Sequence, residues 1–240
     1  TNYVNTQSNL AATQRLTDES IRQAELGIQA AQEQVASAEI GVETAEDNLK
    51  NSISLKNKSN LDTKNSAVIA FNSFMNTMFT TLDQIDSLLN IDNSSNSSVS
   101  NSYDPGLGVK NIDSVKNAIA RYKLAKSLYE SLNVSEVNTD NITKVMSEVN
   151  EALQASEQAL NATIIVLDNS VSSQSLTASY LNTQKNSFLS LRATVVGAQT
   201  SAKTTLQNLQ NLDLIYESDI ETLENALAAA QNQLQRTKTG

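Results

Sequence analysis

The sequence lacks the residue types on which most enzyme mechanisms and metal sites depend. It contains no Cys, no His and no Trp, one Pro and six Gly, and aromatic residues make up 4% of its 240 residues. Without His or Cys, the chain cannot form a Ser-His-Asp or Cys-His relay, an ordinary zinc site or a di-iron site of the Glu-x-x-His type. We therefore expect no enzyme activity, no cofactor and no metal centre.

The scarcity of Gly, Pro and aromatic residues also disfavours strand-rich folds. Strands draw on aromatic and β-branched residues, and their turns draw on Gly and Pro. About 40% of the chain is Asn, Ser, Thr or Gln, and the 39% that is hydrophobic consists largely of Ala, Leu, Val and Ile. This composition predicts an all-α fold with a polar surface.

The charge balance and the apolar runs limit the partners. There are 17 basic and 26 acidic residues, and the resulting net charge of −9 opposes attraction to nucleic acid. The longest apolar run, 162–167, is far shorter than the ~18 residues of a membrane span, and the first ten residues do not form a signal peptide. We expect no nucleic-acid partner, a mature or excised fragment, and membrane contact only through regions outside this chain.

Two stretches near the ends of the chain carry apolar residues at heptad spacing, which is typical of paired helices. Ala recurs at one of the two seam positions of the first stretch, so a partner helix can approach closely, as in a tight antiparallel pair. The predicted stalk seam consists of Ile21, Ala24, Ile28, Ala31, Val35, Ala38, Val42, Ala45 and Leu49 on the outgoing stretch, and of Leu209, Tyr216, Ile220, Leu223, Leu227 and Leu234 on the returning stretch.

The middle of the chain predicts a bundle. Amphipathic spacing over 71–89, 112–129 and 145–166, together with one long helix over 176–235, gives four helices that can share a core. We expect the polar stretch 51–65 to kink or end the first helix. We also expect turns at 134–140, where Thr139 or Asp140 is the N-cap, and at 169–174.

The predicted architecture is a long antiparallel coiled-coil hairpin whose distal half widens into a four-helix bundle. Residues 1–56 and 201–240 form the stalk, with both chain ends together, and 57–200 form the distal bundle. A Ser/Asn-rich loop at 92–110 is the strongest predicted break. Its possible partner-contact residues are Asn96, Ser98, Tyr103, Asp104 and Pro105.

Two other clusters have ordinary explanations. The run 92–96 is similar to the start of a calcium loop but lacks the turn Gly and the Glu at the twelfth position, which favours a solvated loop. The Phe and Met residues within 71–79 suit the core of the bundle better than an adaptable binding face.

The two seam stretches resemble the α-helical hairpin of membrane fusion proteins, the periplasmic adaptors of the haemolysin-secretion type. The resemblance is carried by the Gln-Ala-Glu and Ala-Ala-Gln-Glu-Gln segments within 21–49, and by the Ala- and Gln-rich ending that includes Leu234-Gln-Arg-Thr237. The chain departs from that family where about 140 residues replace the tight hairpin tip. It also has no convincing copy of the Arg-x-x-x-Leu motif that contacts the outer-membrane channel.

This resemblance implies a non-catalytic, extracytoplasmic spacer and docking domain, in the periplasm or cell envelope, of an adaptor in an export or efflux assembly. It also implies protein partners of a transport assembly and a homo-oligomer. One alternative is a ligand-sensing helical bundle of a chemoreceptor-like protein. Another is a coiled-coil surface or fibre protein, although Ala at one seam position is unlike a trimerising heptad.

Overall fold

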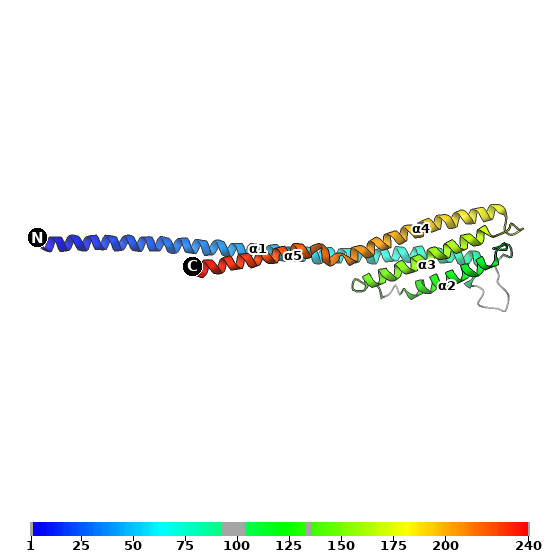
Figure 1. The fold of residues 1–240 in the computed structure, drawn as a ribbon, viewed down its shortest axis with the longest axis horizontal. Coiled ribbons are helices and arrows are strands. Elements are labelled where there is room, and N and C mark those ends of the chain that lie inside the picture. Colours follow the sequence, from blue (N-terminus) through cyan, green and yellow to red (C-terminus); the bar gives the residue numbers. More distant parts are fainter. Residues whose placement is uncertain (1, 93–103, 133–135, 240) are drawn as a thin grey trace. The chain divides into compact units, whose positions relative to one another are not determined.

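The part of the chain that the structure describes consists of helices and the segments that connect them. A computed structural model describes residues 2–92, 104–132 and 136–239. In this part of the chain the helices are α1 (Asn2–Leu89), α2 (Ile112–Ser131), α3 (Ile142–Asp168), α4 (Ala178–Gln210) and α5 (Leu212–Thr239), and no strand is present (Figure 1). The predicted all-α class is confirmed.

The chain divides into two compact units. One, called here the paired-helix unit, comprises Thr1–Lys58 with Asp213–Gly240, and the other, the bundle unit, comprises Ser59–Leu212. The predicted division lay at 56/57 and 200/201, so both boundaries fall further along the chain than expected. Helix α1 contributes to both units, α5 belongs to the paired-helix unit from Asp213 onward, and α2, α3 and α4 lie in the bundle unit.

Helix α1 has no break at the polar stretch where one was predicted. Residues 51–65 are helical throughout, and they contain neither Pro nor Gly. Their Asn, Ser and Lys residues are moderate or good helix formers that do not end a helix by themselves. The partly buried Ser52, Lys56 and Asn60 continue the spacing of the seam before them, so the same face of the helix remains covered.

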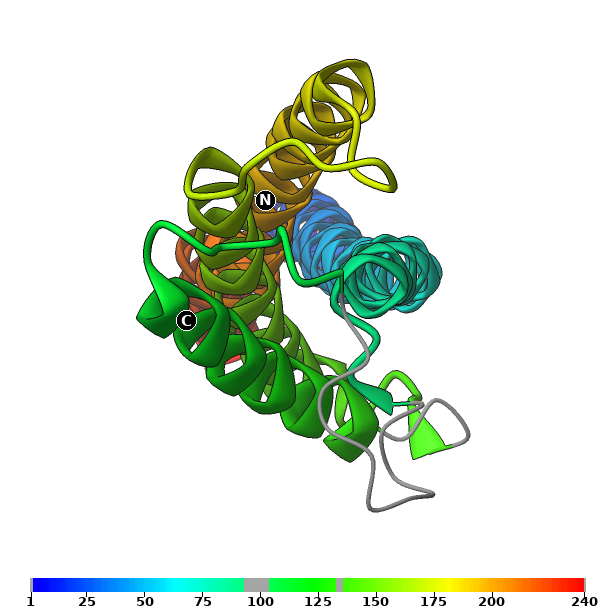
Figure 2. The same ribbon diagram turned by 90° about the vertical axis from the view of Figure 1, so that its right-hand side faces the viewer.

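The bundle unit is built around α3, which packs against α2 on one side and α4 on the other (Figure 2). The last turns of α1 complete the same hydrophobic core. On α4, the residues that enter this core repeat every seven positions, as a long amphipathic helix requires. The largest fully buried side chains are Phe71, Met78, Ile85 and Leu89 from α1, Val115 from α2, Ile142, Met146, Val149, Leu153 and Leu160 from α3, Phe188 from α4, and Leu107 from the segment before α2.

Hydroxyl groups on these helices bond to the backbone of their own helix. The buried Ser156 and Thr163 of α3 donate to the carbonyl oxygens of Ala152 and Ala159, at 2.8 and 2.9 Å. These bonds remove the cost of burying a hydroxyl group without a partner. Exposed threonines do the same, as at Thr44 of α1.

The helix ends explain two departures from the predicted bounds. Helix α3 begins after Asn141, because the Asn138 side chain accepts hydrogen bonds from the N–H groups of Asp140 and Asn141 and holds the predicted cap residues in a turn. The long C-terminal helix is interrupted at Asn211, which separates α4 from α5 while its N–H still bonds to Gln207. Asn weakens a helix because its side chain competes for backbone hydrogen bonds.

Candidate functional site

The first half of the predicted seam on α1 is uncovered. Ile21 and Ile28 are 52% and 59% exposed, and Ala24 and Ala31 are also exposed. The remaining α1 members are partly buried, namely Val35, Ala38, Val42, Ala45 and Leu49. The seam is therefore covered only from Val35 onward.

The seam on α5 is partly buried along the paired-helix unit and runs antiparallel to α1. Lys238 Nζ lies 2.9 Å from Glu39 Oε1, and Thr237 and Val35 line the same shallow surface hollow. When Val35 is placed opposite Thr237, each partly buried residue of the α1 seam lies opposite a partly buried residue of α5. This match extends to Lys56, which lies opposite Tyr216. The partly buried positions on α5 are Tyr216, Ile220, Leu223, Leu227, Ala230, Leu234 and Thr237.

This register explains the uncovered residues. Helix α5 ends at Thr239, which this register places opposite Glu33, so no described residue of α5 lies opposite 21–31. At 1.5 Å per residue, Asn2 lies roughly 55 Å along α1 from Glu39. The prediction that the two chain ends lie together is therefore not met by Asn2 and Thr239, the first and last described residues. Thr1 and Gly240 themselves lie outside the described residues. Leu209, which was assigned to this seam, is buried in the bundle unit.

The predicted partner-contact loop is described only at its end. Asn96, Ser98 and Tyr103 lie outside the described residues. Asp104 is half-buried: its carboxylate accepts hydrogen bonds from the Gly106 N–H, at 2.8 Å, and from the Ser175 hydroxyl. Pro105 is exposed. Asp104 thus stabilises its own loop.

Hydrogen bonds join this segment to the connection between α3 and α4. The Val171 N–H donates to Gly106 O and the Gly108 N–H donates to Ser170 Oγ, both at 3.0 Å. Gly108 has a φ of +65°, and a Cβ atom there would lie 2.4 Å from Val115 Cγ2. Only Gly fits such a position, since the backbone is left-handed and the space is already filled.

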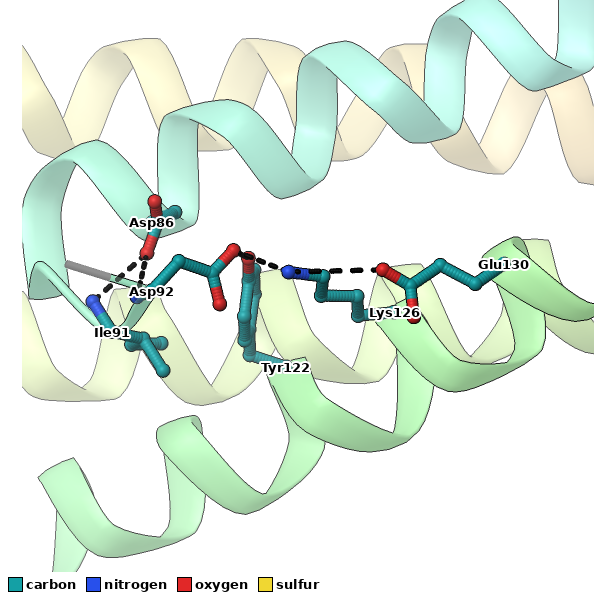
Figure 3. Close-up of polar contacts among 6 residues, drawn as sticks. All are labelled: Asp86, Ile91, Asp92, Tyr122, Lys126 and Glu130. Atoms are coloured by element: carbon teal, nitrogen blue, oxygen red, sulfur yellow. Dashed lines mark hydrogen bonds and ion pairs between the residues drawn. The ribbon is translucent and has the colours of Figure 1, made fainter. Parts of the chain in front are cut away.

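A polar cluster that sequence reasoning missed joins the end of α1 to α2 (Figure 3). Asp92 accepts hydrogen bonds from the Tyr122 hydroxyl, at 2.7 Å, and from the Lys126 ammonium, at 2.5 Å. Lys126 also lies 3.7 Å from Glu130. The Asp86 carboxylate accepts from the N–H groups of Ile91 and Asp92, both at 2.8 Å, next to Asn90, whose φ of 50° ends α1.

The surroundings shift the pKa values of all three central groups. Burial alone raises the pKa of Asp92, but the hydrogen bonds from Lys126 and Tyr122 and the charges of Lys126 and Lys123 outweigh it and lower that pKa. Burial, the hydrogen bond to Asp92 and the neighbouring carboxylates raise the pKa of Tyr122. The hydrogen bond to Asp92, opposed by partial burial, raises the pKa of Lys126. The tyrosine and lysine therefore stay protonated at neutral pH.

These residues border a surface hollow of about 210 Å³, called here the aromatic hollow. Tyr122 and Lys126 are one helical turn apart, a spacing visible in the sequence, but their partner Asp92 lies about 30 residues away across a loop. No local sequence pattern predicts such a contact. The residues that line the hollow are Phe79, Leu82, Asp83, Asp86, Asp92, Tyr122, Lys126, Tyr129 and Glu130.

Two further results concern metal binding and membrane spans, and the similarity of the chain to known proteins. Among the described residues there is no group of three or more Asp or Glu side chains placed to hold a metal ion, and no helix that is long and apolar enough to span a bilayer. Comparison with protein-family models, with curated proteins and with solved structures finds no match to this chain.

Proposed function

We propose that this chain is the extracytoplasmic spacer and docking domain of a membrane-fusion-type adaptor in an export or efflux assembly, where it carries out no catalysis. In this role the paired helices set a fixed separation, and the domain docks on protein partners and on further copies of itself. The resemblance of the two seam stretches to adaptor hairpins supports this proposal.

The observation that carries the proposal is the matched register of α1 and α5. From Val35 opposite Thr237 to Lys56 opposite Tyr216, both helices keep partly buried residues at heptad spacing. In this register Ala38 and Ala45 on α1 face the larger Leu234 and Leu227 on α5, which allows a close approach of the two helices. A pair of this kind resists bending over its length, as a spacer requires.

A matched deletion tests the spacer role. Removing 42–48 from α1 and the opposing 224–230 from α5 takes one heptad from each helix and keeps the remaining residues in register. We expect the variant to keep its helical content and its cooperative unfolding. In cells that produce the whole protein, we expect it to export fluorescent dyes such as ethidium and Hoechst 33342 less well than the wild type.

Two comparisons make the result specific. Deleting 42–48 alone shifts α1 by one heptad relative to α5 and should destabilise the pair. This variant therefore shows the effect of a folding defect on dye export, for comparison with the effect of the shorter length in the matched deletion. A null strain gives the dye level without the protein. If neither the null strain nor the matched deletion accumulates more dye than the wild type, the proposed function is wrong.

A further inference from the structure

The aromatic hollow differs from the rest of the bundle surface in its aromatic content. The chain has four Phe and six Tyr residues, and Phe79, Tyr122 and Tyr129 all line this one hollow. Phe71, Phe74 and Phe188 are at most 5% exposed, whereas Phe79 is 57% exposed. An aromatic ring left in water at the wall of a hollow is a surface for an apolar or cationic ligand.

The charges around the hollow favour a cation. Its lining has four carboxylates, Asp83, Asp86, Asp92 and Glu130, against the one ammonium group of Lys126, so the net charge of the lining is −3. Lys123 lies outside the lining and acts on Asp92 from a distance. Negative charge at an apolar wall attracts cations and repels anions.

Lys126 indicates which kind of cation suits this site. Its ammonium is held between Asp92 and Glu130, and it lies 6.0 Å from the centroid of the Tyr122 ring (Figure 3). A carboxylate next to an aromatic face is the environment in which ammonium groups are stabilised by charge and by cation–π attraction. The protein therefore already binds an ammonium group of its own at the lining of the hollow.

Two carboxylates of the hollow are not fully neutralised by Lys126. Asp83 is exposed and makes no hydrogen bond or ion pair with any described residue, and Glu130 is only loosely paired with Lys126, at 3.7 Å. These two side chains and the exposed ring of Phe79 line the same hollow. A second ammonium group would find charge there that Lys126 does not neutralise.

We propose that the aromatic hollow binds a small organic cation, an ammonium group attached to an aromatic or aliphatic body. The body packs against Phe79 and Tyr129, and the ammonium lies near Asp83 and Glu130. The hollow is smaller than the 300–1,000 Å³ of sites for drug-sized ligands, so the ligand is small. This site does not depend on the proposed spacer role.

The test is a titration of the full chain with three matched probes, followed by heteronuclear NMR of the amide and tyrosine signals. The probes are phenethylammonium, its neutral analogue 2-phenylethanol, and the anion phenylacetate. We expect phenethylammonium to bind about tenfold more tightly than the neutral probe, from cation–π and charge attraction, and phenylacetate not to bind. Its shifts should centre on Tyr122 and Tyr129.

Variants locate the binding. Asp83→Asn combined with Glu130→Gln should weaken phenethylammonium binding about tenfold, and Phe79→Ala should weaken all aromatic probes. Glu151→Gln combined with Glu224→Gln changes the net charge equally, away from the hollow, and should leave binding unchanged. All these side chains are exposed, so the variants should keep the fold. Equal binding of the neutral probe, no saturable binding, or full affinity in the first double variant would overturn the assignment.

Discussion

The paired-helix unit and the bundle unit bury their apolar residues to very different depths. In the bundle unit, side chains such as Phe71, Met78 and Leu160 are at most 1% exposed. In the paired-helix unit, none of the described residues is fully buried, including the whole covered part of the seam. Two helices can cover only one stripe of each other, whereas helices around a common core enclose side chains on every side.

This contrast implies two sources of stability. The bundle unit depends on a few large side chains, each of which contributes several kcal/mol by burial. The paired-helix unit depends on many small contributions repeated every heptad, so no single residue dominates it. Substitutions should therefore have large effects in one unit and graded effects in the other.

The largest expected effect comes from emptying the bundle core. Phe71→Ala removes a ring that is 1% exposed and should lower the free energy of unfolding by about 3–5 kcal/mol. Phe79→Ala, at a ring that is 57% exposed, is the matched control and should cost less than about 1 kcal/mol. Urea unfolding followed by circular dichroism measures both, and equal losses would contradict the predicted burial difference.

Glycine substitutions should have opposite signs in the two units. Gly108→Ala places a Cβ against Val115 at a left-handed position, and we expect it to cost about 1–3 kcal/mol. Gly41→Ala lies within α1 with nothing near its Cβ, and it should stabilise the helix by about 0.5–1 kcal/mol. The midpoints of thermal unfolding should shift in opposite directions. A shift to lower temperature for both variants would mean that the space around Gly41 is filled.

The end of the covered seam can be located with two identical changes. Ala38 is partly buried and Ala31 is exposed. Ala38→Leu should overpack the contact with α5 and cost about 1–2 kcal/mol, whereas Ala31→Leu should change stability by less than about 0.5 kcal/mol. Unfolding in guanidinium chloride compares them. A similar loss for Ala31→Leu would show that a helix covers that position in solution.

The smallest expected effect is the pH response of the polar cluster. Because the pKa of Asp92 is lowered in the folded state, its contribution is present above the ordinary Asp pKa of about 4 and is lost as the pH falls further. The raised pKa of Lys126 makes its contribution disappear only at strongly alkaline pH. Since Asp92 and Lys126 are partly exposed, Lys126→Met should cost less than about 1 kcal/mol at pH 7.

Unfolding at pH 7 and pH 3 measures this contribution. The difference between the wild type and Lys126→Met should shrink at the lower pH, because there the unfolded chain binds a proton at Asp92 more readily than the folded protein does. A difference that stays the same at both values would mean that Lys126 stabilises the bundle through its aliphatic stem rather than through its charge.

The sequence predicts the helices better than their ends and contacts. Apolar spacing locates α2 and α3, and the heptads locate the faces of α1 and α5, because periodicity is a local property. The break expected at 51–65 is absent, since polar residues alone do not end a helix whose neighbouring turns are covered. The Asn138 side chain delays the start of α3 through bonds that depend on the geometry of one turn.

The polar cluster and the loop contacts could not be predicted from one sequence. Asp92 forms hydrogen bonds with Tyr122 and Lys126 of α2 only because the fold brings the segment after α1 beside these two residues. In the same way, Gly108 meets Ser170 across 62 residues of sequence. The extent of the covered seam depends on how far α5 returns along α1, which the spacing of the heptads does not reveal.

The hydroxyl groups that bond to carbonyl oxygens of their own helix have a consequence for the conditions this protein tolerates. Charged residues make up 18% of the chain, below the usual quarter, and neutral amides and hydroxyls occupy much of its exterior. Dissolved ions screen attractions between charges but act little on short contacts between neutral groups. We therefore expect helical content to vary little between dilute buffer and molar sodium chloride.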